Sequence, residues 1–222
     1  MTNDHRYREG LLRFVEDVVS AAKWSDVVYV QLEGNHEDAE SGIHASIALD
    51  NLHNPNGLGH GKPATTKDEK EEIVLISCLG ATITRAQKSP TNNTLETLET
   101  IFLDAQIDNP SYYSDPEATS PEDDASGYLV TGMTRAIDSG KFVKDQKTPV
   151  STSVVYARKR PSGDWEIRIL FDDDGTFIRT GSAGVMVPIV DPAEKQLKGQ
   201  KEAWLFVTGF YSEATVAVRV AL

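Results

Sequence analysis

The sequence predicts an all-β fold with one amphipathic helix near the N-terminus. Twelve short runs rich in β-branched and aromatic residues alternate with turn-forming residues, which is typical of a β-sandwich, a β-barrel or a β-propeller. One early segment has helical periodicity instead. The chain has 222 residues, of which 39% are hydrophobic, so residues 1–222 are expected to form a single domain with a buried core.

The helix is expected over residues 9–23. Apolar residues recur there at the spacing that places them on one face of a helix, and this face should pack on the strands: Leu11, Val15, Val18 and Ala22. Either Asn3 or Asp4 is suited to cap the start of this helix.

The strands are expected to follow in order along the rest of the chain, at residues 27–32, 43–49, 73–77, 82–86, 98–103, 128–132, 153–158, 165–171, 177–179, 185–190, 204–210 and 215–220. Asp173-Asp174-Gly175 predicts a tight hairpin, because glycine tolerates the positive φ that such turns need. Polar stretches without periodicity are expected to be solvated loops, near residues 61–72, 114–127 and 138–150.

The charge and the apolar pattern exclude several classes of protein. The chain has 34 acidic and 22 basic residues, a net charge of −12, and an acidic surface repels nucleic acid and anionic lipid. No apolar run approaches the roughly 20 residues of a transmembrane helix. The polar N-terminal residues do not resemble a signal peptide, and the compartment stays open. A single cysteine, Cys78, excludes an internal disulfide.

No common catalytic signature occurs: the chain has no HExxH, P-loop, GxGxxG or GxSxG motif. Cys78 lies in an apolar run, which favours a structural thiol over a nucleophile. All five histidines lie in the first 60 residues. A zinc site built from them stays open, although their spacing matches no common ligand pattern.

Side-chain oxygens concentrate in three short polar motifs, Asn3-Asp4, Asn54-Pro55-Asn56-Gly57 and Asp108-Asn109-Pro110. Amide and carboxylate oxygens are the hard ligands of calcium, which takes about six to eight of them. A neutral amide ligand leaves the ion electrophilic enough to polarise a carbonyl group. Each motif taken alone is also an ordinary turn or helix cap.

These motifs, taken in order, resemble the serum paraoxonase/arylesterase family of calcium-dependent six-bladed β-propellers. The segments that carry the resemblance are Thr2-Asn3-Asp4-His5, Trp24-Ser25-Asp26-Val27-Val28-Tyr29, Asn54-Pro55-Asn56-Gly57-Leu58, Ile107-Asp108-Asn109 and Thr180-Gly181-Ser182. The resemblance implies an all-β, partial six-bladed propeller of about four blades, lacking the N-terminal blades of the family. It also implies hydrolysis of a small-molecule aryl ester or lactone.

The resemblance further implies a set of metal ligands. Four residues match side-chain ligands of the catalytic Ca2+ of the family: Asn3, Asn56, Asp108 and Asn109. Asp4 matches a ligand of its second, structural Ca2+. No residue is implied as the general base, because Met133 stands where the family has a histidine.

The acidic Glu-Asp pair that completes both calcium shells in the family has no match here. We therefore expect weak calcium binding and slow or undetectable hydrolysis by this chain. Two alternatives stay open: a non-catalytic propeller remnant that acts as a binding or structural module, and a propeller of the gluconolactonase or strictosidine-synthase type. The Asp108-Asn109 pair favours the paraoxonase family over this last type.

Overall fold

The computed structural model of the chain is all-β, as predicted. It describes residues 2–3, 16, 19–32, 42–67, 69–134, 145, 147–191, 193–194 and 199–222. Most of the helix expected over residues 9–23 lies outside these ranges. Glu16, Val19 and Ser20 are helical, and Val19 is 80% exposed. The expected end at residue 23 was wrong, because Ala21 has a φ of 51° and residues 21–23 are not helical. Within the described ranges, no helix has the length and apolar character needed to cross a membrane.

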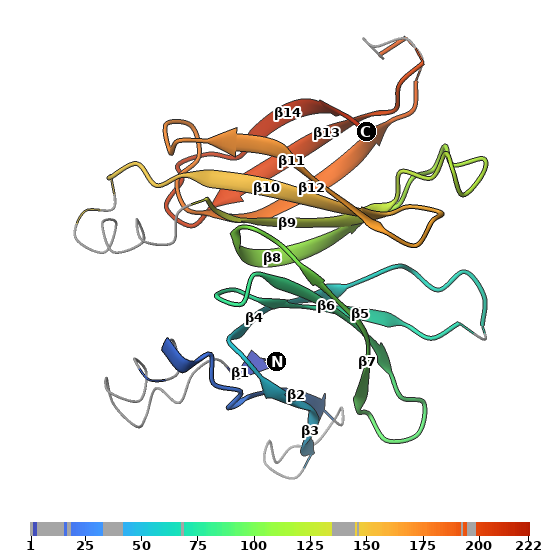
Figure 1. The fold of residues 1–222 in the computed structure, drawn as a ribbon, viewed down its shortest axis with the longest axis vertical. Coiled ribbons are helices and arrows are strands. Elements are labelled where there is room, and N and C mark those ends of the chain that lie inside the picture. Colours follow the sequence, from blue (N-terminus) through green and yellow to red (C-terminus); the bar gives the residue numbers. More distant parts are fainter. Residues whose placement is uncertain are drawn as a thin grey trace.

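The described residues form four antiparallel sheets, each of which follows the chain as a simple meander (Figure 1). The first sheet contains β1 (Thr2–Asn3), β2 (Ser25–Leu32) and β3 (Ile43–Leu52). The second contains β4 (Pro55–His60), β5 (Glu72–Ser77), β6 (Thr82–Lys88) and β7 (Leu95–Phe102). The third contains β8 (Gln106–Tyr113), β9 (Gly127–Met133), β10 (Thr152–Lys159) and β11 (Trp165–Asp173). The fourth contains β12 (Gly181–Ile189), β13 (Glu202–Gly209) and β14 (Val216–Ala221).

Eleven of the twelve predicted strands overlap with strands of the structure. The prediction was wrong for residues 177–179, which form a bend because the Asp173 carboxylate accepts hydrogen bonds from the backbone N–H groups of Gly175, Phe177 and Ile178. The predicted hairpin at Asp173-Asp174-Gly175 was also wrong, since this turn connects the third sheet to the fourth. Three further strands, β1, β4 and β8, were not predicted.

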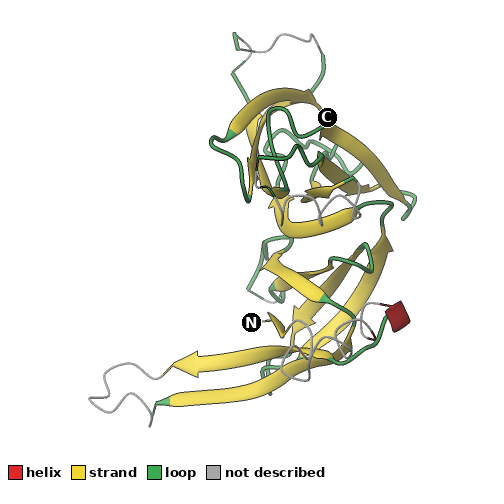
Figure 2. Ribbon diagram, turned by 90° about the vertical axis from the view of Figure 1, so that its left-hand side faces the viewer, coloured by secondary structure: helices red, strands yellow, loops and turns green. Residues whose placement is uncertain are grey.

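The first strands of successive sheets lie next to one another. β1 contacts β4, β4 contacts β8, and β8 contacts β12. The sheets are therefore stacked in chain order, from the N-terminal sheet at the bottom of Figure 1 to the C-terminal sheet at the top. The hairpin of β2 and β3 projects from this stack at the lower left of Figure 2.

Each pair of neighbouring sheets encloses its own hydrophobic cluster. Val27 and Leu75 belong to the cluster between the first and second sheets. The middle sheets show most clearly how a strand serves two clusters, because successive side chains of a strand point to opposite faces. In β9, Tyr128 and Val130 pack with residues of the second sheet, whereas Leu129 packs with residues of the fourth. Residues 128–132 are accordingly buried without alternation.

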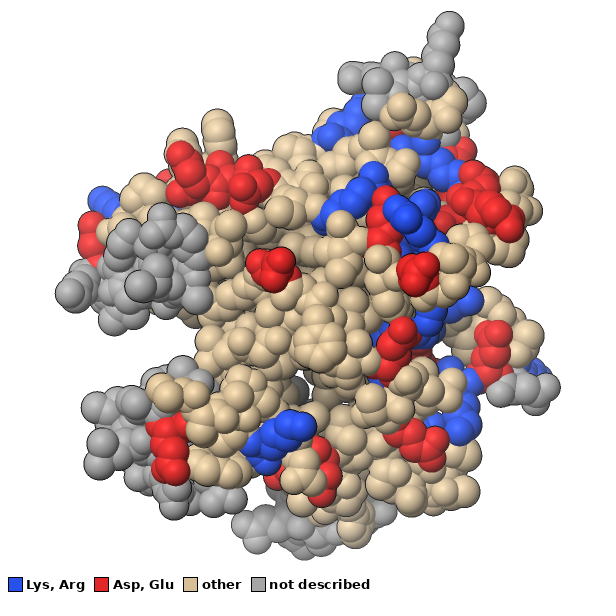
Figure 3. Space-filling view, in the orientation of Figure 1, with Lys and Arg blue, Asp and Glu red and all other residues tan. Residues whose placement is uncertain are grey.

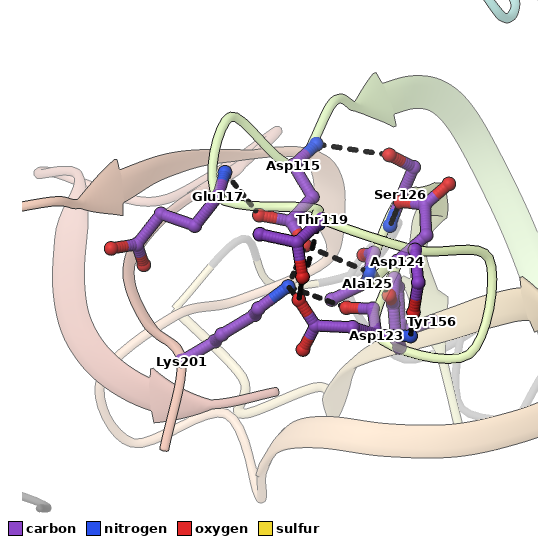
Figure 4. Close-up of polar contacts among 10 residues, drawn as sticks. Asp115, Glu117, Thr119, Asp123, Asp124, Ala125, Ser126, Tyr156 and Lys201 are labelled. Atoms are coloured by element: carbon purple, nitrogen blue, oxygen red, sulfur yellow. Dashed lines mark hydrogen bonds and ion pairs between the residues drawn. The ribbon is translucent and has the colours of Figure 1, made fainter. Parts of the chain in front are cut away.

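The polar stretch after β8 is folded against the fourth sheet and is not the freely solvated loop that was expected (Figure 4). The side chain of Asp115 is only 1% exposed and accepts hydrogen bonds from the N–H groups of Glu117 and Ala125, both at 2.9 Å. Lys201, next to β13, donates to Asp115 Oδ2 at 2.5 Å and pairs with Asp123 Oδ2 at 3.0 Å. This lysine thus fixes both ends of the loop.

The two terminal sheets of the stack each leave an apolar face exposed. In the first sheet Leu32 is paired with Ile43, and their exposed fractions are 72% and 54%. In the fourth sheet Val185 is paired with Phe206, and their exposed fractions are 49% and 36%. In the view of Figure 3 charged side chains gather toward the margins of the molecule, while its middle is largely uncharged.

Candidate metal centre

The structure brings together three of the five residues that were expected to bind metal. Asn56 lies in β4, and Asp108 and Asn109 lie in β8. Asn3 lies in β1, where its backbone pairs with Asp26 of β2. Asp4 lies outside the described residues.

Hydrogen bonds connect these side chains to a fourth residue, Ser182 of β12. Asn56 Nδ2 donates to Asp108 Oδ1 at 2.5 Å, and Ser182 Oγ donates to Asp108 Oδ2 at 2.6 Å. Asn109 Nδ2 lies 3.1 Å from both Ser182 Oγ and the Ser182 carbonyl oxygen. We call Asn56, Asp108, Asn109 and Ser182 the amide–carboxylate cluster.

A β-bulge occurs at each of the three places where a strand contributes to the cluster. The pairing register shifts between Pro55 and Leu58 in β4, between Ile107 and Pro110 in β8, and between Gly181 and Ala183 in β12. Such bulges release residues from regular pairing and redirect their side chains. The bulges therefore explain why four side chains from three sheets point toward one another.

Unusual backbone conformations precede two of these bulges. Asn54 has a φ of 45° and Thr180 a φ of 52°, in the left-handed region. Asparagine tolerates this region, and Asn54 Oδ1 also accepts a hydrogen bond from Leu79 N at 3.0 Å. A β-branched threonine is unfavourable there, and strained residues of this kind concentrate near functional sites.

Close backbone contact between β4 and β8 requires a glycine in the cluster region. A Cβ atom on Gly57 would lie 2.4 Å from the carbonyl oxygen of Asp108 and 3.0 Å from Asn109 Cα. Both distances are shorter than van der Waals contact, so any side chain at this position would push the two strands apart. Gly57 thus permits the spacing at which Asn56 reaches Asp108.

Asp108 supplies the formal negative charge of the cluster. Burial raises the pKa of its carboxyl group, and the hydrogen bonds from Ser182 and Asn56 counteract part of this increase. A cation beside Asp108 would favour the ionised form. No group of three or more His, Cys, Asp or Glu side chains suited to a metal ion occurs among the described residues.

The donor chemistry of the cluster nevertheless fits calcium, because one carboxylate, two amides and one hydroxyl are all hard oxygen ligands. The Asn56 amide presents its nitrogen to Asp108, and the Asn109 amide presents its nitrogen to Ser182. Both amides would have to turn by about half a rotation to offer oxygen to an ion.

His5 and His36, two of the histidines considered for zinc, lie outside the described residues.

A cavity of about 340 Å3 adjoins the cluster. Its walls include Asn56 and Asp108 together with the apolar residues Ile107, Met133 and Phe210. Ligand pockets of small-molecule enzymes are typically concave and mostly apolar, with a few convergent polar groups, and begin at about 300 Å3. The cavity therefore has the size and the lining of a small-molecule site.

Sequence reasoning did not identify Ser182 as a site residue. The motif Gly181-Ser182-Ala183-Gly184 contains a serine between small residues but lacks the spacing of a nucleophile elbow. Its role depends on the bulge in β12 and on the packing of β12 against β8, neither of which has a local sequence signal.

A scan against protein-family models and a search of curated proteins found no match to this chain. The link to the paraoxonase/arylesterase family therefore depends on the short motifs of the sequence.

Proposed function

We propose that the chain is a calcium-dependent hydrolase of aryl esters or lactones, related to the paraoxonase/arylesterase family. The observation that supports this function best is the meeting of Asn56 with Asp108 and Asn109 in one cluster, since Asn56 lies 52 positions before Asp108 and in another strand. The resemblance of the sequence to the paraoxonase/arylesterase family implies all three as ligands of the same ion.

The arrangement of the sheets supports the proposal that the fold is part of a six-bladed β-propeller. A propeller consists of meander sheets arranged radially around a central channel. The meander order of every sheet and the contacts between successive first strands are those expected of neighbouring blades. The cluster lies on these first strands, which in a propeller surround the channel.

In this proposal Asn56, Asp108 and Asn109 hold the ion, and Ser182 orients Asp108 and Asn109. A bound calcium ion would polarise the ester or lactone carbonyl and stabilise the negative charge that develops on its oxygen. The adjoining cavity would receive the apolar part of the substrate and exclude water from it.

A non-catalytic binding module is the second candidate. One observation favours it: the described residues that line the cavity include no histidine, and Met133 lies at the position where the family has one. Without a base, the cluster and cavity would bind an ion and a small ligand but would not activate water.

Calorimetric titration with CaCl2 and an esterase assay distinguish these candidates. Asp108→Asn removes the formal charge of the cluster at nearly constant shape, and Asp50→Asn is the control because Asp50 is exposed in β3. We expect Asp108→Asn to weaken calcium binding by about tenfold or more, since calcium affinity follows ligand charge. Asp50→Asn should bind calcium as the wild type does.

The assay uses phenyl acetate and δ-valerolactone with calcium or with EGTA. Turnover that EGTA removes and that Asp108→Asn reduces supports the hydrolase. Calcium binding without turnover supports the binding module. Equal calcium titrations of wild type and Asp108→Asn would contradict both assignments, because they would show that Asp108 does not bind the ion.

A further inference from the structure

The side chain of Gln106 is a polar group of the cavity beside the cluster that the proposed function leaves unused. Gln106, the first residue of β8, lines the cavity together with Asp108, two residues further along the strand. Its amide nitrogen donates to Cys78 Sγ at 3.3 Å. Its Oε1 atom is buried and has no hydrogen-bond partner among the described residues.

A carbonyl oxygen in this situation is suited to accept a hydrogen bond from a ligand. Native structures contain few buried polar atoms without a partner, and those few call for an explanation. The sulfur of Cys78 is a weak acceptor, so it holds the Gln106 amide loosely. The terminal torsion of a glutamine side chain is also broad. Rotation about this torsion is the movement that would bring Oε1 to the surface of the cavity.

The rest of the cavity restricts what the ligand is. Ile107 and Met133 provide apolar walls, and Phe210, which is 73% exposed, lies at the rim. Asp108 is the one charged residue among the described residues that line the cavity. The other described lining residues are uncharged, so a charged group on the body of the ligand would lose its hydration there without an ionic partner, and the cavity favours a neutral ligand.

We propose that Gln106 makes this site selective for neutral esters or lactones that carry a hydrogen-bond donor, a hydroxyl or an N–H group, on a small apolar body. This inference rests on the proposed hydrolase function, because the carbonyl of the substrate would face the amide–carboxylate cluster. The donor would meet Gln106 Oε1 while the apolar body lies against Met133, the cross-strand partner of Gln106, and Phe210. Gln106 is then the residue that determines specificity.

A matched pair of esters tests the selectivity. 4-Hydroxyphenyl acetate and 4-methylphenyl acetate differ by the exchange of a hydroxyl for a methyl group. We expect wild-type kcat/KM to favour the hydroxyl compound by about tenfold, because the methyl compound leaves Oε1 without a donor. Gln106→Leu should abolish this preference, whereas Gln106→Glu, which keeps an acceptor, should retain it.

Binding of the corresponding phenols separates this inference from the proposed function. Hydroquinone and 4-methylphenol are titrated by NMR in the presence of EGTA, so neither calcium nor turnover is needed. If wild type and Gln106→Glu bind hydroquinone more tightly than 4-methylphenol and Gln106→Leu does not, the inference is supported, even where no ester is hydrolysed. Absence of ester hydrolysis would contradict only the proposed hydrolase function. Equal affinities of wild type and Gln106→Leu for both phenols overturn the inference, whatever the enzyme assay shows.

Discussion

Ser182 shows how much of the site depends on one hydroxyl group. Its oxygen donates to Asp108 and lies within hydrogen-bond distance of the Asn109 amide, so it joins β12 to the bulge of β8. The neighbouring Ser111 of β8 adds a second link of this kind, from its hydroxyl to the carbonyl of Gly184 in β12 at 2.6 Å. Removal of either hydroxyl loosens the contact between the third and fourth sheets, but only Ser182 bonds to a charged group.

Ser182→Ala is therefore expected to lower the free energy of unfolding by about 1.5–3 kcal/mol, the range for hydrogen bonds to charged groups. Ser182→Thr keeps the hydroxyl and should lose less than half of that amount. Urea unfolding followed by tryptophan fluorescence measures both variants at pH 7. Alanine and threonine variants of equal stability would show that the hydroxyl does not hold Asp108.

At the scale of the element, the loop after β8 illustrates a polar segment with a defined structure. Residues 114–127 have no apolar periodicity, and the sequence offers no sign that Asp115 becomes buried. What organises the loop is a partner 86 residues away, Lys201. Burial alone would raise the pKa of Asp115, but the hydrogen bonds from Lys201 and the backbone outweigh it and lower the pKa below its usual value.

The pKa of Asp115 predicts a dependence of stability on pH. Because its pKa is lower in the folded state than in the unfolded state, ionised Asp115 stabilises the fold above about pH 4. This contribution is lost as the pH falls through the folded-state pKa. Urea unfolding at pH 7, 5 and 3.5 should therefore show a smaller acid-induced loss of stability for Asp115→Asn than for wild type. An identical loss in the two proteins would contradict the assignment, and Asp50→Asn serves as the exposed control.

The strands also show what could be predicted from the sequence and what could not. Residues 128–132 and 153–158 were identified because runs of β-branched and aromatic residues between turn-forming residues are typical of strands. β4 and β8 were missed because Pro55, Gly57 and Asp108-Asn109-Pro110 are turn-forming residues. In the fold these residues form the bulges. The meeting of Asn56 with Asp108 and Asn109 was therefore expected from the sequence, whereas the strands that carry these residues were not.

At the scale of the whole molecule, two opposing properties coexist. The net charge of −12 keeps copies of the chain apart, while both ends of the stack of sheets expose apolar faces. The face of the fourth sheet includes Val185, Val187 and Phe206. These side chains carry no charge themselves. The association of two such faces is therefore opposed by the long-range repulsion between the net charges of the two chains.

Salt should shift this balance. The screening length falls from about 10 Å at 0.1 M salt to about 3 Å at 1 M, so added NaCl weakens the repulsion and leaves the apolar attraction intact. Light scattering at constant protein concentration is expected to rise with NaCl. The double variant Val185→Thr and Val187→Thr should reduce that rise in scattering. Met186 lies between them but points to the buried face, so Met186→Thr should instead lower the free energy of unfolding. A fall in scattering with added NaCl would contradict the prediction that the apolar faces drive association of the chains.

The amide–carboxylate cluster has one more consequence, for partly folded states of the chain. Its four residues come from the second, third and fourth sheets, and no single sheet contains more than two of them. A molten globule, which keeps hairpins but loses fixed packing between them, would retain every cluster residue and still lack the cluster. A ligand of this site thus binds only the fully packed state and stabilises it by mass action. Its binding curve, followed during acid titration, would report the loss of contact between sheets while circular dichroism still records intact strands.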